Sequence, residues 1–377
     1  MQHTRTGRPK QKLLYVVGAR PNFVKIAPVL AELQRRLPDA EHVVVHTGQH
    51  YDPELSELFI EQLGLPQPAH RLDIGSGSHA EQTARAMERL EAVVAADPPD
   101  LAFVPGDVNS TLAAALVLAK LGVPYAHVES GLRSFDRTMP EEINRIVADQ
   151  FAEHLFAHSD EAVENLRREG IEAERVHLVG NTMIDTLCRL EPQFRELRFA
   201  DQLGLRTKEF VLVTLHRPSL VDGELLEPVL EQLQSVAERI PVVFPVHPRT
   251  RERIAVPDRY PDVRLIAPIG YLEFLSLEAD AGAVLTDSGG VQEETTFLGV
   301  PCFTLRSVTE RPVTTRLGTN VVLGLDPARI PEIVDAVGAD QPERRVPPLW
   351  DGHASERMAD IVVPWLLSDV LTRPPAS

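Results

Sequence analysis

The run TDSGGVQEE, from Thr286 to Glu294, follows the apolar stretch AGAVL and precedes the apolar segment TFLGVP. An apolar strand, a polar turn with two glycines and a helix start, in that order, predict a β-to-α junction. Adjacent glycines allow positive φ and a close approach of the backbone to a ligand. The helix N-terminus would direct free N–H groups and its positive dipole end at a phosphate or diphosphate. The carboxylates of Glu293 and Glu294 suit hydroxyl groups instead, such as a ribose diol. On this run alone, a tight capped turn without a ligand explains the pattern equally well.

The same alternation of strand and helix continues along the chain. Short β-branched runs such as LLYVVG, LAFVPGD and FVLVTLH alternate with amphipathic segments such as FVKIAPVLAELQRRL and GELLEPVLEQLQSVAERI. This order predicts the α/β class with doubly wound parallel sheets. LLYVVGARP, which ends at Pro21, is echoed by FVLVTLHRP, which ends at Pro218. The echo predicts two Rossmann-like domains, residues 11–181 and 182–355, whose parallel sheets face a ligand cleft at the strand C-terminal ends.

Composition and charge restrict the class of protein. The 377 residues suffice for two domains, and a formal net charge of −17 argues against nucleic acid or an anionic membrane as the main partner. Cys188 and Cys302 are too few for a disulfide framework, so a reduced, cytoplasmic setting is expected. We expect no signal peptide and no membrane helix.

Two patterns suggest a cofactor or a metal, but neither is convincing. GSGSHA, residues 75–80, matches a dinucleotide fingerprint but follows a poor strand, and Ser78 with Glu81 indicates a capping box. His154 and His158 have the spacing of helical metal ligands, although HLFAH is more typical of a strand. We therefore expect no bound cofactor and no metal.

Charged side chains collect where the predicted strands end, and these are Arg20, Lys25, Asp107, Glu129, Glu141, Glu142, His216, Glu310 and Arg311. Most of these residues also have a simpler, structural explanation. Asp107 could cap a helix, and Glu141 and Glu142 could stabilise a helix N-terminus by their negative charge. A single histidine at a strand end, such as His216, is more often structural than catalytic. Glu129 is harder to explain, since a charge directly after the apolar run PYAHV must be paired or solvated. A functional role gains weight because all these residues fall on one edge.

The chain resembles the non-hydrolysing UDP-N-acetylglucosamine 2-epimerase family from about Leu13 to the end of the second domain. The resemblance is carried, in order, by GARPNFVKIAP, HTGQHYDPE, GDVNSTLA, HVESGLRSFDRTMPEEINR, VGNTMIDTL, LHRPS, TDSGGVQEE and TERP. It implies the glycosyltransferase-B fold, with a UDP-sugar in the cleft and a homodimer. It also implies that a C-terminal helix, about residues 356–372, completes the first domain.

The implied activity is isomerisation of UDP-N-acetylglucosamine (UDP-GlcNAc) to UDP-N-acetylmannosamine (UDP-ManNAc). In the family, UDP is eliminated in an anti sense to give 2-acetamidoglucal and is then added to the other face. By motif position, the catalytic residues implied are Asp107, Glu129, Glu141 and His216. The implied substrate-binding residues are Arg20, Ser288, Gly289 and Gly290 for the diphosphate, Lys25 and Arg311 for sugar or nucleotide, Glu294 for ribose, Phe274 for uracil, and His247.

Three positions depart from well-known bacterial members. Asn22 follows Pro21 where those members often have glutamate, HRPS replaces HRRE after His216, and TGQHYDPE replaces TAQHR. The family's activation by a second UDP-GlcNAc is therefore open here. Other readings also stay open: a modified substrate such as a UDP-diacetamido-sugar uronic acid, a hydrolysing 2-epimerase, a glycosyltransferase on the same fold, or a nucleotide-sugar sensor without catalysis.

Overall fold

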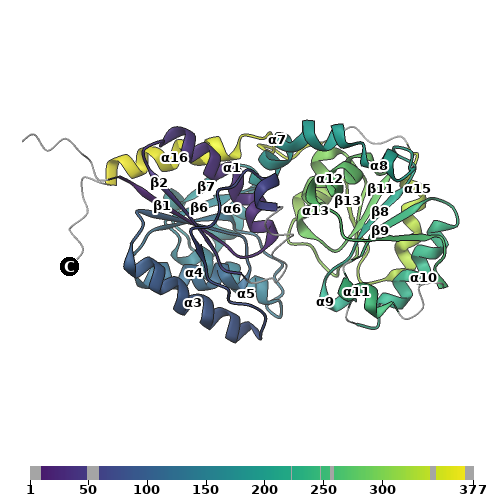
Figure 1. The fold of residues 1–377 in the computed structure, drawn as a ribbon, viewed down its shortest axis with the longest axis horizontal. Helices are drawn as coiled ribbons and strands as arrows, with labels where there is room; N and C mark the ends of the chain where they lie inside the picture. The colour runs from purple at the N-terminus through teal and green to yellow at the C-terminus, as the bar shows by residue number, and fades with distance from the viewer. Residues whose placement is uncertain are drawn as a thin grey trace, which may run out of the picture. The chain divides into compact units, whose positions relative to one another are not determined.

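The computed structural model describes residues 10–48, 59–221, 223–246, 248–254, 259–339 and 345–369. The chain forms two compact units, one of Met1–Thr186 with His353–Ser377 and one of Leu187–Gly352. Each is a parallel sheet covered by helices (Figure 1), which confirms the predicted α/β class with two Rossmann-like sheets.

The sheet of the first unit is parallel throughout, with strand order β3-β2-β1-β4-β5-β6-β7. Its strands are β1 (Lys12–Val17), β2 (Glu41–His46), β3 (His70–Arg71), β4 (Leu101–Pro105), β5 (Tyr125–Ser130), β6 (His154–Ala157) and β7 (Val176–Leu178). The order reverses between β1 and β4, which is the topological switch point where a Rossmann-like sheet accepts ligands at its carboxyl edge.

Helices cover both faces of this sheet (Figure 1). One face carries α3 (His79–Ala96), α4 (Asn109–Lys120) and α5 (Pro140–Phe151). The helix α6 (Asp160–Arg168) joins this face, because its Leu166 lies in the same apolar cluster as residues of α3, α4 and α5. The other face carries α1 (Arg20–Arg36) and α16 (Ala354–Asp369). Because both faces are covered, strands such as β4 are buried along their whole length and read as continuous apolar runs.

The second unit has a parallel sheet of order β10-β9-β8-β11-β12-β13. Its strands are β8 (Val211–Thr214), β9 (Val242–Pro245), β10 (Val263–Ile266), β11 (Ala283–Thr286), β12 (Cys302–Thr304) and β13 (Asn320–Val322). Its helices are α8 (Phe199–Gln202), α9 (Pro218–Val221), α10 (Leu226–Ala237), α11 (Pro248–Arg253), α12 (Tyr271–Asp280), α13 (Gly289–Leu298), α14 (Pro312–Arg316) and α15 (Ile333–Ala336). Helix α7 (Thr182–Leu197) contains the boundary between the units.

The core of the second unit has two layers because successive side chains of a strand point to opposite faces. Val211 and Val213 belong to one apolar cluster, whereas Phe210 and Leu212 belong to the other. The predicted junction at Thr286 is present: β11 ends there and α13 begins at Gly289.

Two readings of local sequence are confirmed. The Ser78 side chain accepts a hydrogen bond from the Glu81 amide, and the Glu81 carboxylate accepts one from the Ser78 amide at 2.9 Å. Residues 75–80 therefore lead into a capped helix. His154 lies at the start of strand β6, as the strand reading of HLFAH predicts.

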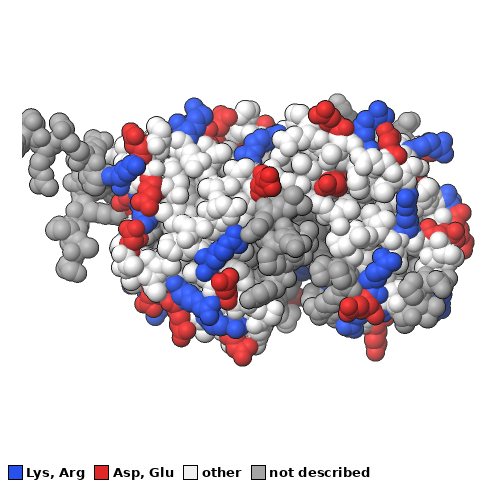
Figure 2. All heavy atoms as spheres, in the orientation of Figure 1, with Lys and Arg blue, Asp and Glu red and all other residues white. Residues whose placement is uncertain are grey.

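Figure 2 shows basic and acidic side chains interspersed over the face in view, with no single basic patch there. Within the described ranges, no helix has the length and apolar character that crossing a membrane requires.

The last helix, α16, belongs to the first unit and packs against α1. Asp185 of α7 holds its N-terminus, because the carboxylate accepts hydrogen bonds from the amides of Ala354 (3.0 Å) and Ser355 (2.6 Å). Nearby, the Thr186 hydroxyl donates to the Val24 carbonyl of α1 at 2.7 Å. The start of α7 thus ties the last helix to the first.

We expect Asp185→Ala to lower the free energy of unfolding by about 1–2 kcal/mol, because two amides of the first helical turn lose their acceptor. Urea denaturation followed by circular dichroism measures this change. The matched control is Asp360→Asn, which weakens a surface pair with Arg36 on the same helix and should change stability by less than about 0.5 kcal/mol. Equal effects of the two variants would contradict the capping role.

Candidate functional site

The polar groups of the first unit gather at the carboxyl edge of its sheet. Strands β4 and β5 are neighbours, with Pro105 opposite Val128, so the segments that follow them lie side by side. Asp107 comes just after β4 and Glu129 lies at the end of β5. Two of the predicted catalytic carboxylates therefore leave the sheet from adjacent strands.

Glu129 occupies an unusual backbone position. Its φ is 71°, and the pairing of β5 with β6 shifts register between Val128 and Ser130. A residue with a Cβ in this left-handed region costs about 1–3 kcal/mol and persists only where its surroundings enforce it. The carboxylate forms an ion pair with Lys25 of α1, and each side chain is only 6% exposed. Lys25, predicted to bind sugar or nucleotide, is thus also the partner of the carboxylate.

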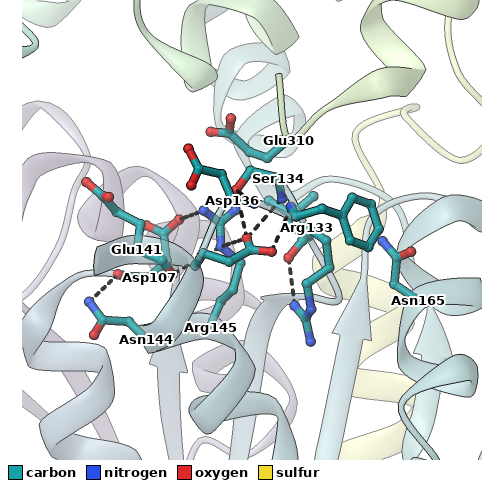
Figure 3. A network of polar contacts seen from close by, with 12 residues as sticks. Asp107, Arg133, Ser134, Asp136, Glu141, Asn144, Arg145, Asn165 and Glu310 are labelled. Carbon is teal, nitrogen blue, oxygen red and sulfur yellow. Dashed lines mark hydrogen bonds and ion pairs between the residues drawn. The ribbon is translucent and has the colours of Figure 1, made fainter. Parts of the chain in front are cut away.

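Asp107 is held by two neighbouring residues of α5. The Asn144 amide donates to the Asp107 carbonyl at 2.8 Å, and Nη2 of Arg145 lies 3.6 Å from an Asp107 carboxylate oxygen. Arg145 is buried, while the Asp107 side chain is 25% exposed. Figure 3 shows Asn144 and Arg145 both directed at Asp107. The exposed carboxylate can reach a ligand while its backbone stays fixed.

Glu141 and Glu142, adjacent on α5, have different environments. Glu142 is buried and accepts hydrogen bonds from the Ser134 amide (2.9 Å), the Ser134 hydroxyl (3.0 Å) and the Phe135 amide (2.9 Å). It therefore holds the segment that leads into the helix. Glu141, the predicted catalytic residue, is only half-buried.

The first helix begins with another fixed turn. The Asn22 side-chain oxygen accepts hydrogen bonds from the amides of Gly18 (3.1 Å) and Ala19 (3.0 Å), and its amide donates to the Pro105 carbonyl at 3.1 Å. A carboxylate could not make this last bond, so Asn22 links the ends of β1 and β4 in a way that the usual family glutamate cannot. Arg20 is exposed at the first position of α1, where a helix N-terminus favours anions.

In the second unit, His216 is held by Asp287. Strands β8 and β11 are adjacent, with Thr214 opposite Thr286. The fully buried Asp287 carboxylate accepts hydrogen bonds from the amides of His216 (2.9 Å) and Arg217 (2.7 Å), and lies 3.1 Å from Nδ1 of His216. The His216 side chain remains 59% exposed. Burial alone would raise the pKa of Asp287, but the hydrogen bond and charge of His216 and the two amides lower it.

The glycine turn packs directly against a buried guanidinium. A Cβ on Gly289 would lie 2.3 Å from Nη1 of Arg311, so a larger residue would require the Arg311 side chain to move. Arg311 pairs with Glu293 at 2.9 Å and with Glu310 at 2.5 Å, and Glu310 also pairs with Arg306 at 2.7 Å. Ser288 occupies the N-cap position just before this turn. The start of α13 thus combines helix amides with a fixed cation.

Glu294, on α13, faces a tyrosine of α12. The Tyr271 hydroxyl donates to the Glu294 carboxylate at 2.7 Å. Burial raises the pKa of Glu294 to about 7, the Tyr271 hydrogen bond opposes this rise, and the charge of Glu293 adds to it. Phe274, three residues beyond Tyr271, is half-buried against the apolar cluster beneath. His247 lies outside the described residues.

Sequence reasoning assigned no role to several of these residues, namely Asn144, Arg145, Tyr271 and Asp287. Asp287 lies inside the run TDSGGVQEE and Tyr271 inside YLEF, so the motifs contained them. For Asp287 the available signal was position, since it directly follows strand β11. Asn144 and Arg145 lie within α5, inside the motif MPEEINR.

The chain is similar in sequence and in fold to known proteins. Residues 31–363 match the sequence profile of the UDP-N-acetylglucosamine 2-epimerase family. The UDP-N-acetylglucosamine 2-epimerase of Methanocaldococcus jannaschii is 38% identical over 363 residues, which cover 93% of this chain and 98% of that protein. The crystal structure of that enzyme in complex with UDP-GlcNAc and UDP has a TM-score of 0.85, covering 94% of this chain and 99% of the other.

Two further relatives bear on substrate and fold. The UDP-2,3-diacetamido-2,3-dideoxy-D-glucuronate 2-epimerase of Pseudomonas aeruginosa is 43% identical over 318 residues, covering 83% of this chain and 88% of the other. The glycotransferase of kitacinnamycin is 15% identical and has a TM-score of 0.58 over 96% of this chain and 100% of the other, which shows the fold alone. The fold is therefore of the glycosyltransferase-B type, as the resemblance implied.

The pKa of Glu294 generates a prediction about stability. Because its folded pKa is raised to about 7 from about 4.3 in an unfolded chain, the folded state keeps a proton that the unfolded state loses between these values. The contribution of Glu294 to the free energy of unfolding should therefore fall as pH rises from about 4.5 to 7, by about 3 kcal/mol.

Urea denaturation of the wild type and of Glu294→Gln at several pH values measures this contribution. In Glu294→Gln the free energy of unfolding should lack the part of its decline with pH that Glu294 causes. In the control Glu209→Gln, at an exposed position, it should decline with pH as in the wild type. Parallel pH profiles for the wild type and Glu294→Gln would contradict the raised pKa.

Proposed function

Because this chain belongs to the UDP-N-acetylglucosamine 2-epimerase family, and is thus an isomerase, we propose that it interconverts UDP-GlcNAc and UDP-ManNAc. The first half-reaction removes the proton from C2 of the sugar. The C2–H electron pair forms a C1=C2 double bond, and the C1–O bond breaks with its electrons leaving on UDP. The product is 2-acetamidoglucal. Addition of UDP to C1 and return of a proton to C2 on the opposite face complete the inversion.

The first unit would supply the proton-transfer groups. Inversion at C2 needs bases on two faces of the ring, and the unit offers Asp107, Glu129 and Glu141 near one edge of its sheet. The observation that carries the proposal is Glu129, a carboxylate in strained backbone paired with buried Lys25. A protein that only bound a nucleotide would have no use for a strained acidic residue at this edge.

The second unit would bind UDP. The diphosphate would be held by the backbone amides of Ser288, Gly289 and Gly290 at the start of α13, with Arg311 as a cation. Arg20 of the first unit would add a second cation. We assign the ribose to Glu294, the uracil to Phe274, a phosphate contact or proton transfer to His216, and further substrate contacts to Lys25 and His247. Asp287 supports this role of His216 by fixing its backbone and ring.

A second candidate substrate is a UDP-2,3-diacetamido sugar uronic acid. The observation that favours it is the identity of 43% to the Pseudomonas aeruginosa enzyme named for such a substrate. The same elimination and addition would apply, since the reacting atoms C1 and C2 are unchanged. We also expect a homodimer, which the resemblance implies, and a cytoplasmic location, which the small number of cysteines favours. Sedimentation of the purified protein tests the first.

Proton NMR of the purified protein in D2O tests the reaction. With UDP-GlcNAc and no added NAD or metal, we expect a UDP-ManNAc anomeric signal and deuterium at C2. Free N-acetylmannosamine with UDP would indicate a hydrolysing enzyme. Conversion of the diacetamido uronic acid but not of UDP-GlcNAc would establish the second candidate. Binding of UDP without conversion of either sugar would sink the epimerase proposal.

We expect Glu129→Gln to lower kcat by about 100-fold or more, because the amide cannot accept the C2 proton. UDP binding, most of whose contacts we assign to the second unit, should change by less than about threefold in Kd by calorimetry. Glu174→Gln, at an exposed position of the same unit, is the control and should keep full turnover. Unchanged kcat in Glu129→Gln would remove Glu129 from the mechanism.

A further inference from the structure

A buried histidine lies directly beneath the proposed catalytic edge. His127 is on β5, two residues before Glu129, and its side chain is fully buried. Its Nδ1 lies 2.6 Å from Asp149 of α5, and its Nε2 lies 2.8 Å from the Gly106 carbonyl oxygen. Neither His127 nor Asp149 has a catalytic or substrate-binding role in the proposed function.

The hydrogen bonds define the roles of the two side chains. The other Asp149 oxygen accepts a hydrogen bond from the Gly131 amide at 3.1 Å and pairs with Arg133 at 2.7 Å. Burial would raise the pKa of Asp149, but the charges and hydrogen bonds of His127 and Arg133 lower it. Asp149 is therefore an acceptor only. Both ring nitrogens of His127 face acceptor oxygens, so each is placed to donate a hydrogen bond, and the Asp149 carboxylate is shared between His127 and the Arg133 guanidinium.

The bridge formed by His127 and Asp149 contacts the backbone beside Asp107 at one end and beside Glu129 at the other. Gly106 immediately precedes Asp107, so the Nε2 bond fixes the peptide that carries this carboxylate. Gly131 lies two residues after Glu129, so the Asp149 bond fixes the far side of the strained position. The bridge thus ties the backbone beside one proposed catalytic carboxylate to the backbone beside the other.

We propose that His127, with Asp149, is a positioning residue that sets the separation of Asp107 and Glu129. The inference rests on the proposed epimerase function. A buried charge pair is costly to desolvate, and an apolar pair of similar volume is often as stable or more so. A purely structural role therefore explains the bridge less well than the need to hold two carboxylates in register with a reacting carbon, where an error of 1 Å costs about 100-fold in rate.

Two substitutions at the same position separate the two bonds of the ring. In His127→Gln the side-chain amide nitrogen can occupy the place of Nε2 and keep the bond to Gly106. In His127→Asn it occupies the place of Nδ1, keeps Asp149 and leaves the Gly106 carbonyl without this donor. In either variant Asp149 still accepts a hydrogen bond from the Gly131 amide and pairs with Arg133. A difference in kcat between the two variants therefore reports the loss of the hydrogen bond to the Gly106 carbonyl, beside Asp107. We expect His127→Asn to lower kcat by about 100-fold and His127→Gln by less than about tenfold.

The readouts separate positioning from folding. For each variant, kcat and KM follow from the NMR assay, Kd for UDP from calorimetry, and stability from thermal unfolding. UDP affinity should stay within about threefold of the wild type. His154→Asn on the adjacent strand β6, where His154 is buried and lies 3.2 Å from His177, is the control: it should lower stability but leave kcat unchanged.

The outcomes distinguish this inference from the proposed function. A wild type that does not invert C2 overturns the proposed function. A wild type that does, with equal kcat losses in the Asn and Gln variants that follow their losses of stability, overturns the positioning role. If His127→Asn fails to fold, Asp149→Asn decides: a loss of kcat of tenfold or more with UDP affinity retained supports the bridge, and unchanged kcat refutes it.

Discussion

All strands within each sheet run in one direction, and that constraint organises the molecule. A parallel strand can be reached only through a crossover, so the segments leaving the carboxyl ends of neighbouring strands meet at a single edge. In the first unit this brings Asp107 and Glu129 together from β4 and β5. In the second it brings His216 beside Asp287 from β8 and β11, residues 71 positions apart in sequence. Chemistry-bearing side chains are thus collected without any special loop.

Buried carboxylates then fix the backbone at the polar edges and at the start of the last helix by accepting hydrogen bonds from backbone amides. Asp287 receives the amides of His216 and Arg217, Glu142 those of Ser134 and Phe135, and Asp185 those of Ala354 and Ser355. An ionised acceptor strengthens each bond, and loss of the carboxylate would leave buried donors unsatisfied. The more exposed His216 is in this way held from behind by Asp287.

Much of this architecture follows from sequence pattern, because periodicity and glycine turns determine where strands end. The junction at Thr286, the capped helix after Ser78 and the strand-end positions of Asp107 and Glu129 are all visible in the sequence. Pattern could not distinguish Glu141 from Glu142, since neighbours on a helix point about 100° apart and only packing decides which turns inward. Nor could it pair Asp287 with His216, Tyr271 with Glu294, or His127 with Asp149, because those contacts depend on strand register and helix packing.

The placement of α16 determines the order in which the two units can fold during translation. The first unit is interrupted in sequence, since residues 187–352 form the second unit before the chain returns at His353. At ordinary translation rates the ribosome takes on the order of 10 s to make that insertion. During this interval α16 has not yet been synthesised, so α1 lacks this neighbour. Asp185 likewise lacks the α16 amides to which it bonds in the finished protein. The nascent second unit can thus complete its core first, and the N-terminal unit, although synthesised earlier, becomes whole last.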